Sequence, residues 1–254
     1  MPLDYLSRLT AQPRSNQANL HIGILLTLVA GALNAGGFLA VGQYTSHMTG
    51  MVSTLADQIV LHNHELVIVA LGSWLAFVAG AATTALLVNY SRRRQADNPY
   101  ASPLLLEAVF ILLFGSFGGA LQAEVFAQVS LAVIVLCFAM GLQNALITKI
   151  SRAEIRTTHV TGLTTDLGIE LGKLIYWNRH DPRGMAPVIL ANRAKMRVHA
   201  ALIGAFFTGG LLGALGFKYL GFVSTVPLAL VLGVIAVTPV LRKPKPASTD
   251  RTPM

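Results

Sequence analysis

Long apolar runs that are almost free of charge alternate with short polar segments along this chain of 254 residues. Only 12% of the residues are charged, about half of the ~25% found in an average soluble domain. A bilayer-spanning helix needs ~20 predominantly apolar residues, so the pattern indicates an all-α integral membrane protein. Six runs reach that length: residues 20–42, 65–90, 103–122, 125–148, 198–217 and 219–241.

Lysine and arginine are concentrated in every second connection between these runs. Of the 19, the N-terminal lead holds 2, the second connection 3, the fourth 9 and the tail 4, whereas the first and third hold none and the fifth holds only Lys218. Basic loops stay in the cytoplasm because their translocation is costly. The pattern therefore predicts six spans with both termini cytoplasmic. It also explains the net charge of +8 by topology, so no nucleic-acid partner is expected.

The polar stretches divide the chain into an N-terminal lead, two three-helix repeats and a tail. The predicted segments are 1–19, 20–124, 125–241 with a long basic cytoplasmic loop at 149–197, and 242–254. The lead has no apolar centre, so we do not expect a cleavable signal peptide. The single cysteine, Cys137, excludes an internal disulfide and a cysteine metal site.

One motif occurs in both halves of the chain. Its copies are Gly31-Ala-Leu-Asn34-Ala35 with Ser46-His47-Met48-Thr49-Gly50, and Gly141-Leu-Gln143-Asn144-Ala145 with Thr158-His159-Val160-Thr161-Gly162. Three spans per repeat is an odd number, so the second repeat enters the membrane from the opposite side. The fold predicted is therefore two inverted-topology repeats. The shorter similarity between residues 77–80 and 206–209 fits the same duplication, or chance.

An apolar run with helical spacing follows each Thr-Gly pair. Both runs are about 12–15 residues long, too short to cross a bilayer. We expect each to form a re-entrant or interfacial half-helix after the first span of its repeat, with Thr49 or Thr161 as the N-cap. Helix N-termini carry partial positive charge and free N–H groups. If both half-helices dip inward, their ends would meet near the midplane and suit a small anionic or carbonyl-bearing solute.

The polar and small residues of the two copies are the candidate substrate-binding or pore-lining residues. They are Asn34, His47, Thr49, Gly50, Gln143, Asn144, Thr158, His159, Thr161, Gly162 and Asp166. A buried amide needs a partner, so the two asparagines face protein or a wet cavity. Hydrogen bonds between helices are the structural alternative. The histidines, beside helix N-termini, are expected to be neutral and to bind substrate, relay protons or cap a loop.

Four charged residues near the spans allow simpler interpretations. Glu170 and Lys173 are expected on a solvated helix face, whereas Asp166 is compatible with either a functional or a surface role. Glu107, one turn into the third span, is expected to reach the cytoplasmic surface. The pair Gly209 and Gly213 suits close helix packing within the chain or between copies, which leaves the oligomeric state open.

No phosphate-binding glycine loop, nucleophile elbow or zinc motif occurs in the sequence. We therefore predict a protein that is not an enzyme and has no cofactor or metal. Its expected partners are the lipid bilayer and a small molecule or ion, as in a secondary transporter. The alternative is a non-transporting sensor or scaffold, in which the basic loop 149–197 binds a partner or anionic lipid.

The second copy of the motif carries a resemblance to a known family. Residues 139–145 and 156–166 resemble the YoaK family of bacterial membrane proteins, domain of unknown function 1275, over most of residues 20–241. The first copy departs from that pattern, because the family commonly has Asp where Asn34 stands and Asn where Met51 stands. Asn34 cannot titrate. The resemblance implies a bacterial inner-membrane protein of about six spans and carries no substrate with it.

Overall fold

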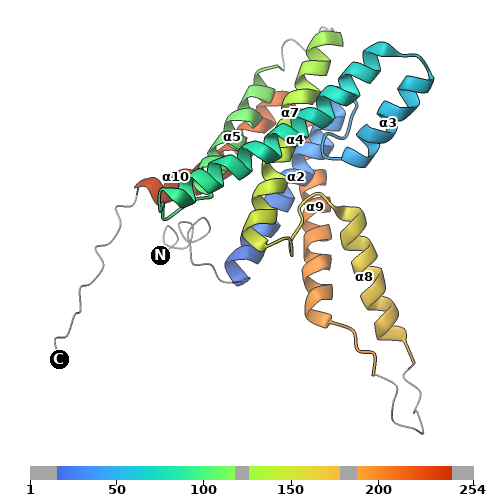
Figure 1. Cartoon of the computed structure of the whole chain (residues 1–254), viewed down its shortest axis with the longest axis vertical. Coiled ribbons are helices and arrows are strands. Elements are labelled where there is room, and N and C mark those ends of the chain that lie inside the picture. Colours follow the sequence, from blue (N-terminus) through green and yellow to red (C-terminus); the bar gives the residue numbers. More distant parts are fainter. Residues whose placement is uncertain (1–15, 118–125, 178–187, 242–254) are drawn as a thin grey trace, which may run out of the picture.

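The computed structural model describes residues 16–117, 126–177 and 188–241, which form helices and connections without any β-strand. The helices are α2 (Asn16–Val41), α3 (Met48–Val60), α4 (His64–Arg93), α5 (Ala101–Ser116), α7 (Phe126–Ser151), α8 (Val160–Ile175), α9 (Arg193–Leu220), the short 3₁₀ helix η1 (Gly221–Ser224) and α10 (Thr225–Leu241). Figure 1 shows their arrangement. The N-terminal lead up to residue 15 and the tail from residue 242 lie outside the described residues.

Four stretches among the described residues are long and apolar enough to cross a membrane: Gln17–Val41, His64–Arg93, Val129–Ser151 and Arg193–Thr238. They overlap the predicted spans one, two, four, five and six. The last stretch includes both α9 and α10, which are separated by η1 at Gly221, where φ is +62°. The predicted runs 198–217 and 219–241 place the break at Lys218, three residues before the observed one. The third predicted span corresponds to the shorter α5, and its last residues are not described.

Asparagine side chains cap the N-termini of two of the long helices. Asn63 Oδ1 accepts a hydrogen bond from the backbone N–H of Leu66 at the start of α4 (3.3 Å). Asn192 Oδ1 accepts one from the N–H of Lys195 at the start of α9 (3.0 Å). Such caps satisfy N–H groups that have no partner within the helix. The second span of each half thus begins with the same capping chemistry.

The helices of the two halves pack mainly across the halves. α2 packs along α9, and α4 packs along α7. The crossings are close because glycine lies at each: a Cβ on Gly31 would collide with the carbonyl oxygen of Phe206, and a Cβ on Gly141 with that of Phe77. Gly31 and Gly141 are matching residues of the twin motif. The two crossings therefore use equivalent positions.

The partner helices contribute matching glycines to the same crossings. A Cβ on Gly209 of α9 would collide with the carbonyl oxygen of Leu28, and a Cβ on Gly80 of α4 with that of Phe138. Gly209 and Gly80 are the last residues of the stretches 206–209 and 77–80, whose similarity could also have arisen by chance. Their equivalent contacts give that similarity a structural role.

Gly213 lies one turn after Gly209 and also packs against α2, where a Cβ would collide with the carbonyl oxygen of Ala32. The Gly209-x-x-x-Gly213 motif therefore serves packing within the chain, one of the two roles that the sequence left open.

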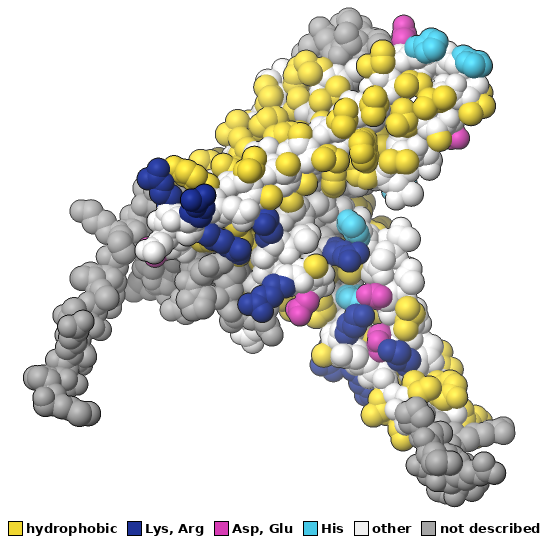
Figure 2. Space-filling model, viewed as in Figure 1, with side chains coloured by type: hydrophobic (Ala, Val, Ile, Leu, Met, Phe, Trp, Pro, Cys, Tyr) yellow, Lys and Arg dark blue, Asp and Glu magenta, His cyan; other side chains and the backbone are white. Residues whose placement is uncertain are grey.

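α2 and α7 form the centre of the molecule, and α5 and α10 pack together beside them (Figure 1). Gln143 Nε2 on α7 donates a hydrogen bond to the carbonyl oxygen of Leu26 on α2 (2.9 Å). Exposed apolar side chains cover the face over α4, whereas Lys and Arg gather toward the other end of the molecule, on the face drawn in Figure 2. Such an apolar face suits contact with lipid.

Candidate functional site

Each asparagine of the twin motif holds the chain segment that precedes a short helix. Asn34 Oδ1 accepts hydrogen bonds from the hydroxyl of Ser46 (2.8 Å) and from its backbone N–H (3.3 Å). Asn144 Oδ1 accepts a hydrogen bond from the hydroxyl of Thr158 (2.7 Å). Ser46 and Thr158 each directly precede the histidine of their copy. The two copies therefore use equivalent contacts to join the first span to the short helix.

The two asparagines lie at different levels of the antiparallel pair α2 and α7. Gln143 bonds to Leu26, so Asn144 lies about level with residue 26 of α2. Asn34 is eight residues further along α2, about 12 Å at 1.5 Å per residue. The asparagines therefore do not meet at one point, and each belongs to its own half of the molecule.

The short helices α3 and α8 begin two residues earlier than predicted. They start at Met48 and Val160, with His47 and His159 at the N-cap positions and no side-chain capping hydrogen bond. The prediction that Thr49 and Thr161 are the N-caps is therefore wrong, because both lie inside the first turn. The first N–H groups of each helix thus donate no hydrogen bond to the N-cap side chain.

The small residues of the two first turns have different surroundings. A Cβ on Gly50 would collide with the imidazole of His47, which folds back over the turn. Gly162 has open space around the same position. Thr49, Thr161 and Gly162 are exposed. The start of α8 is therefore the more open of the two.

The surroundings of His159 favour the neutral form of its imidazole. Desolvation lowers the pKa of His159, and the positive charge of Arg156 lowers it further. The Nη1 atom of Arg156 lies 3.5 Å from Nδ1 of His159. A neutral imidazole keeps one donor and one acceptor nitrogen. The sequence predicts the neutral form from the helix dipole, whereas burial and Arg156 are the causes in the structure.

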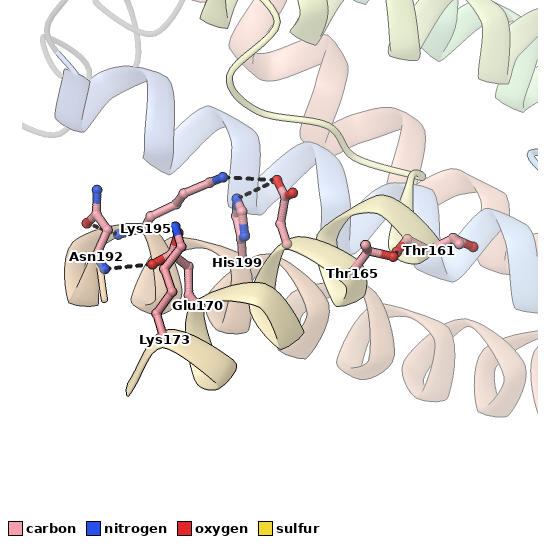
Figure 3. A network of polar contacts seen from close by, with 8 residues as sticks. Thr161, Thr165, Glu170, Lys173, Asn192, Lys195 and His199 are labelled. Carbon is pink, nitrogen blue, oxygen red and sulfur yellow. Dashed lines mark hydrogen bonds and ion pairs between the residues drawn. The ribbon is translucent and has the colours of Figure 1, made fainter. Parts of the chain in front are cut away.

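Beyond the first turn of α8, charged side chains connect this helix to α9 (Figure 3). Lys195 Nζ lies 3.2 Å from Oδ2 of Asp166, and His199 Nε2 lies 3.9 Å from the same oxygen. His199 is 4% exposed, and its Nδ1 has no partner among the described residues. Asp166 therefore contacts the second span of its half, away from Asn144.

Glu170, one turn after Asp166, holds the start of α9. Its Oε2 accepts a hydrogen bond from the backbone N–H of Asn192 (2.7 Å), and Oε1 lies 2.8 Å from Nζ of Lys173. The hydrogen bond from Lys173 and then that from Asn192 lower the pKa of Glu170. Glu170 is only 4% exposed, so its expected place on a solvated face is wrong. Lys173 stays partly exposed, and its Nζ atom forms the ion pair with Glu170.

Two threonines that are not among the predicted site residues are buried beside the motif. The hydroxyls of Thr45 and Thr157, like the Oε1 atom of the candidate Gln143, have no hydrogen-bond partner among the described residues. Thr45 and Thr157 are matching positions, two residues before each histidine. Extending the aligned copies by one residue, to the positions before Ser46 and Thr158, would have identified this pair.

The sequence matches a family model over residues 22–238, described as protein of unknown function DUF1275. It is 24% identical over 213 residues to the UPF0700 transmembrane protein YoaK of Bacillus subtilis (strain 168), covering 83% of this chain and 90% of that protein. No solved structure matches the chain. The resemblance found in the second copy of the motif is confirmed, and the chain belongs to the DUF1275 family of membrane proteins of unknown function.

Proposed function

We propose that the protein is a secondary-transporter-like carrier of a small solute, built from six spans as two inverted repeats, in a bacterial inner membrane. The observation that carries the proposal is the equivalence of the two crossings. Gly31 with Phe206 and Gly141 with Phe77 are contacts between matching positions. Inverted repeats that pack on each other around a central site are the usual architecture of alternating-access carriers.

The short helices provide the second line of support. α3 has 13 residues and α8 has 16, about 20 and 24 Å long at 1.5 Å per residue, against a hydrocarbon core of ~30 Å. Figure 1 shows both beginning near the middle of the molecule and running toward opposite ends. Half-helices that end inside a bilayer present free N–H groups to a substrate.

Contacts along α8 and α9 give the level of one N-terminus. Asp166 lies opposite His199 on the antiparallel helix, so the start of α8 is about level with Phe206. The carbonyl of Phe206 is the group that approaches Gly31. α3 and α4 form a hairpin, so the start of α3 is about level with Phe77 of α4. Both N-termini thus begin beside a glycine crossing, which supports a shared central region.

The chemistry of these N-termini favours a solute with accepting oxygens. The first turns of both helices expose N–H donors, and the neutral His159 adds a donor and an acceptor. An anion or a carbonyl compound would satisfy these groups. The second half-site, with Asn144, Thr158 and an open Gly162, is the better candidate for most of the contacts.

The test is uptake and counterflow by purified protein in proteoliposomes, across classes of small anionic and neutral solutes. We expect flux for at least one class, reduced by more than half in His159→Ala and Asn144→Ala. Thr165→Ala is the matched control, because its hydroxyl bonds only to the Thr161 carbonyl within α8. If wild type moves and binds none of the solutes, or if both site variants behave as wild type, the proposal fails.

Cysteine accessibility distinguishes the carrier from a sensor with surface helices. The single native cysteine, Cys137, is buried, so Thr49→Cys and Thr161→Cys can be read in a nearly silent background. In a carrier, labelling by a membrane-impermeant maleimide should be partial and should change with solute. Complete labelling of Thr49→Cys from outside and of Thr161→Cys from the cytoplasm would mean surface helices and would support the sensor or scaffold.

A further inference from the structure

Glu107 is a carboxylate inside an apolar helix, and it does not reach the surface. It is the only ionisable residue of α5 and is 0% exposed. Neither of its carboxylate oxygens has a hydrogen-bond partner among the described residues. The expectation that Glu107 reaches the cytoplasmic surface is therefore wrong, because its side chain is buried among the packed helices.

The register of α5 against α7 gives the depth of Glu107. The rings of Phe110 and Phe138 stack with centroids 4.4 Å apart. The two helices run in opposite directions, so Glu107, three residues before Phe110, is about level with Gly141 (Figure 1). Glu107 therefore lies at the level of the crossing of α4 and α7, where Thr84 donates to the Leu142 carbonyl (3.0 Å).

The helices packed against α5 offer this carboxylate no described counter-ion. α5 contacts α7, α10, η1 and α4, and α10 and η1 contain no ionisable side chain. The ionisable residues of the other two are Cys137 and Lys149 on α7, and His64, Glu65, Tyr90, Arg92 and Arg93 at the two ends of α4. Lys149 is eight residues from Gly141, about 12 Å along α7.

Polar groups lead from Glu107 toward the arginine-bearing end of α4. Tyr100 is seven residues, or two turns, before Glu107, and so lies on the same side of the chain. Its hydroxyl accepts a hydrogen bond from Nη2 of Arg92 (2.8 Å), and Arg92 is exposed. This end of α5 therefore connects to an exposed, water-accessible side chain.

An ionised carboxylate without a partner is strongly disfavoured in such surroundings, whereas the protonated acid is neutral. A carboxyl group held inside a membrane protein at this cost marks a functional site by default. We propose that Glu107 is an intramembrane proton-binding site, which exchanges its proton with water while the protein remains folded. This inference does not depend on whether the protein transports a solute.

The test is infrared spectroscopy of the full-length protein in lipid nanodiscs, comparing wild type with Glu107→Gln. We expect a protonated-carboxyl C=O band in wild type at pH 7 that is missing in Glu107→Gln and that shifts in D2O within minutes. Glu107→Asp keeps an acid at the site and should keep a band. Glu65→Gln is the matched control, because Glu65 is an exposed carboxylate in the first turn of α4.

A band missing from wild type would overturn the proposal, as would a band that exchanges only when the protein unfolds, which is the behaviour of a purely structural acid. Dicyclohexylcarbodiimide, which reacts with protonated carboxyl groups in apolar sites, provides a second readout by peptide mapping. We expect an adduct on Glu107 in wild type and in Glu65→Gln. If sodium chloride protects Glu107 and choline chloride does not, the bound ion is sodium and the proton assignment is wrong.

Discussion

At the scale of single residues, the twin asparagines act as anchors for the start of a helix. Asn34 and Asn144 accept hydrogen bonds from hydroxyls that lie 12 and 14 residues further along the chain. The sequence allowed hydrogen bonds between helices, whereas these oxygen atoms instead accept hydrogen bonds from the segments that precede α3 and α8. A role in binding a solute stays a prediction.

The anchor of the second half should be measurable as a coupling energy. In a double-mutant cycle, Asn144→Ala and Thr158→Ala should couple by about 0.6 kcal/mol, the average for hydrogen bonds between membrane helices, with ~1.7 kcal/mol as the upper end. The measurement is the free energy of unfolding in mixed micelles. Asn144→Ala combined with Thr165→Ala is the control and should show no coupling. Equal values for the two cycles would contradict the anchor.

Residue identity alone could not predict burial. Sequence position placed Glu107 one turn inside a span, where a long side chain can often reach water. Its burial depends on α7 and α10, which pack on α5 from much later in the chain. Glu170 was misjudged for the same reason, because its partner Asn192 lies 22 residues away. The twin motif was visible because both copies keep residue type and order.

At the scale of helices, the crossings of α2 with α9 and of α4 with α7 depend on glycine. In each, a backbone carbonyl of one helix occupies the space that a Cβ would need on the other. A carbonyl belongs to the main chain and cannot rotate away as a side chain can. Motif and charge predict two repeats, but they do not predict which helices pair across the halves.

Gly141→Ala should therefore destabilise the protein, although alanine is the better helix former. Overpacking of this kind costs about 1–3 kcal/mol. Gly168→Ala is the matched control, because Gly168 lies within α8 with no atom near its missing Cβ. It should gain up to about 1 kcal/mol from helix propensity. Thermal unfolding in detergent measures both, and a neutral Gly141→Ala would show that the crossing is looser than described.

The contact of Glu170 with α9 should weaken in acid. Its pKa is lower in the folded protein than the ordinary value of 4.5, so the unfolded chain binds the proton more readily. The stabilisation is fully present above pH ~4.5 and is lost as the pH falls through the folded-state value. Unfolding midpoints between pH 7 and pH 3 should fall less in Glu170→Gln than in wild type. Identical profiles would argue against the contact.

At the scale of the whole molecule, the distribution of basic residues was the most informative part of the sequence. It predicts the number and direction of spans without any knowledge of packing. Figure 2 shows Lys and Arg gathered away from the upper right end of the face drawn, whereas acidic and histidine side chains lie both at that end and among the basic residues. The four candidate spans agree with five of the six predicted runs, because α9 and α10 form one continuous apolar stretch.

Reporter fusions can test the predicted orientation. Fluorescent protein at the C-terminus should fluoresce, and alkaline phosphatase at the same place should be inactive, because the four basic residues of the tail predict that it stays in the cytoplasm. Phosphatase inserted between α3 and α4, after Leu61, should be active in the periplasm. An active phosphatase at the C-terminus would reverse the orientation or change the number of spans.

The packing of each half against the other also determines how the protein can be made. α2 leaves the ribosome long before its main partner α9, and α4 leaves before α7. The glycine-lined faces of α2 and α4 therefore remain uncovered, in the lipid or beside the insertion machinery, until the second half is inserted. A chain that stops after the first half would expose both faces permanently. Quality-control proteases should therefore remove such fragments, whereas separately synthesised halves should rescue each other by assembling in the same bilayer.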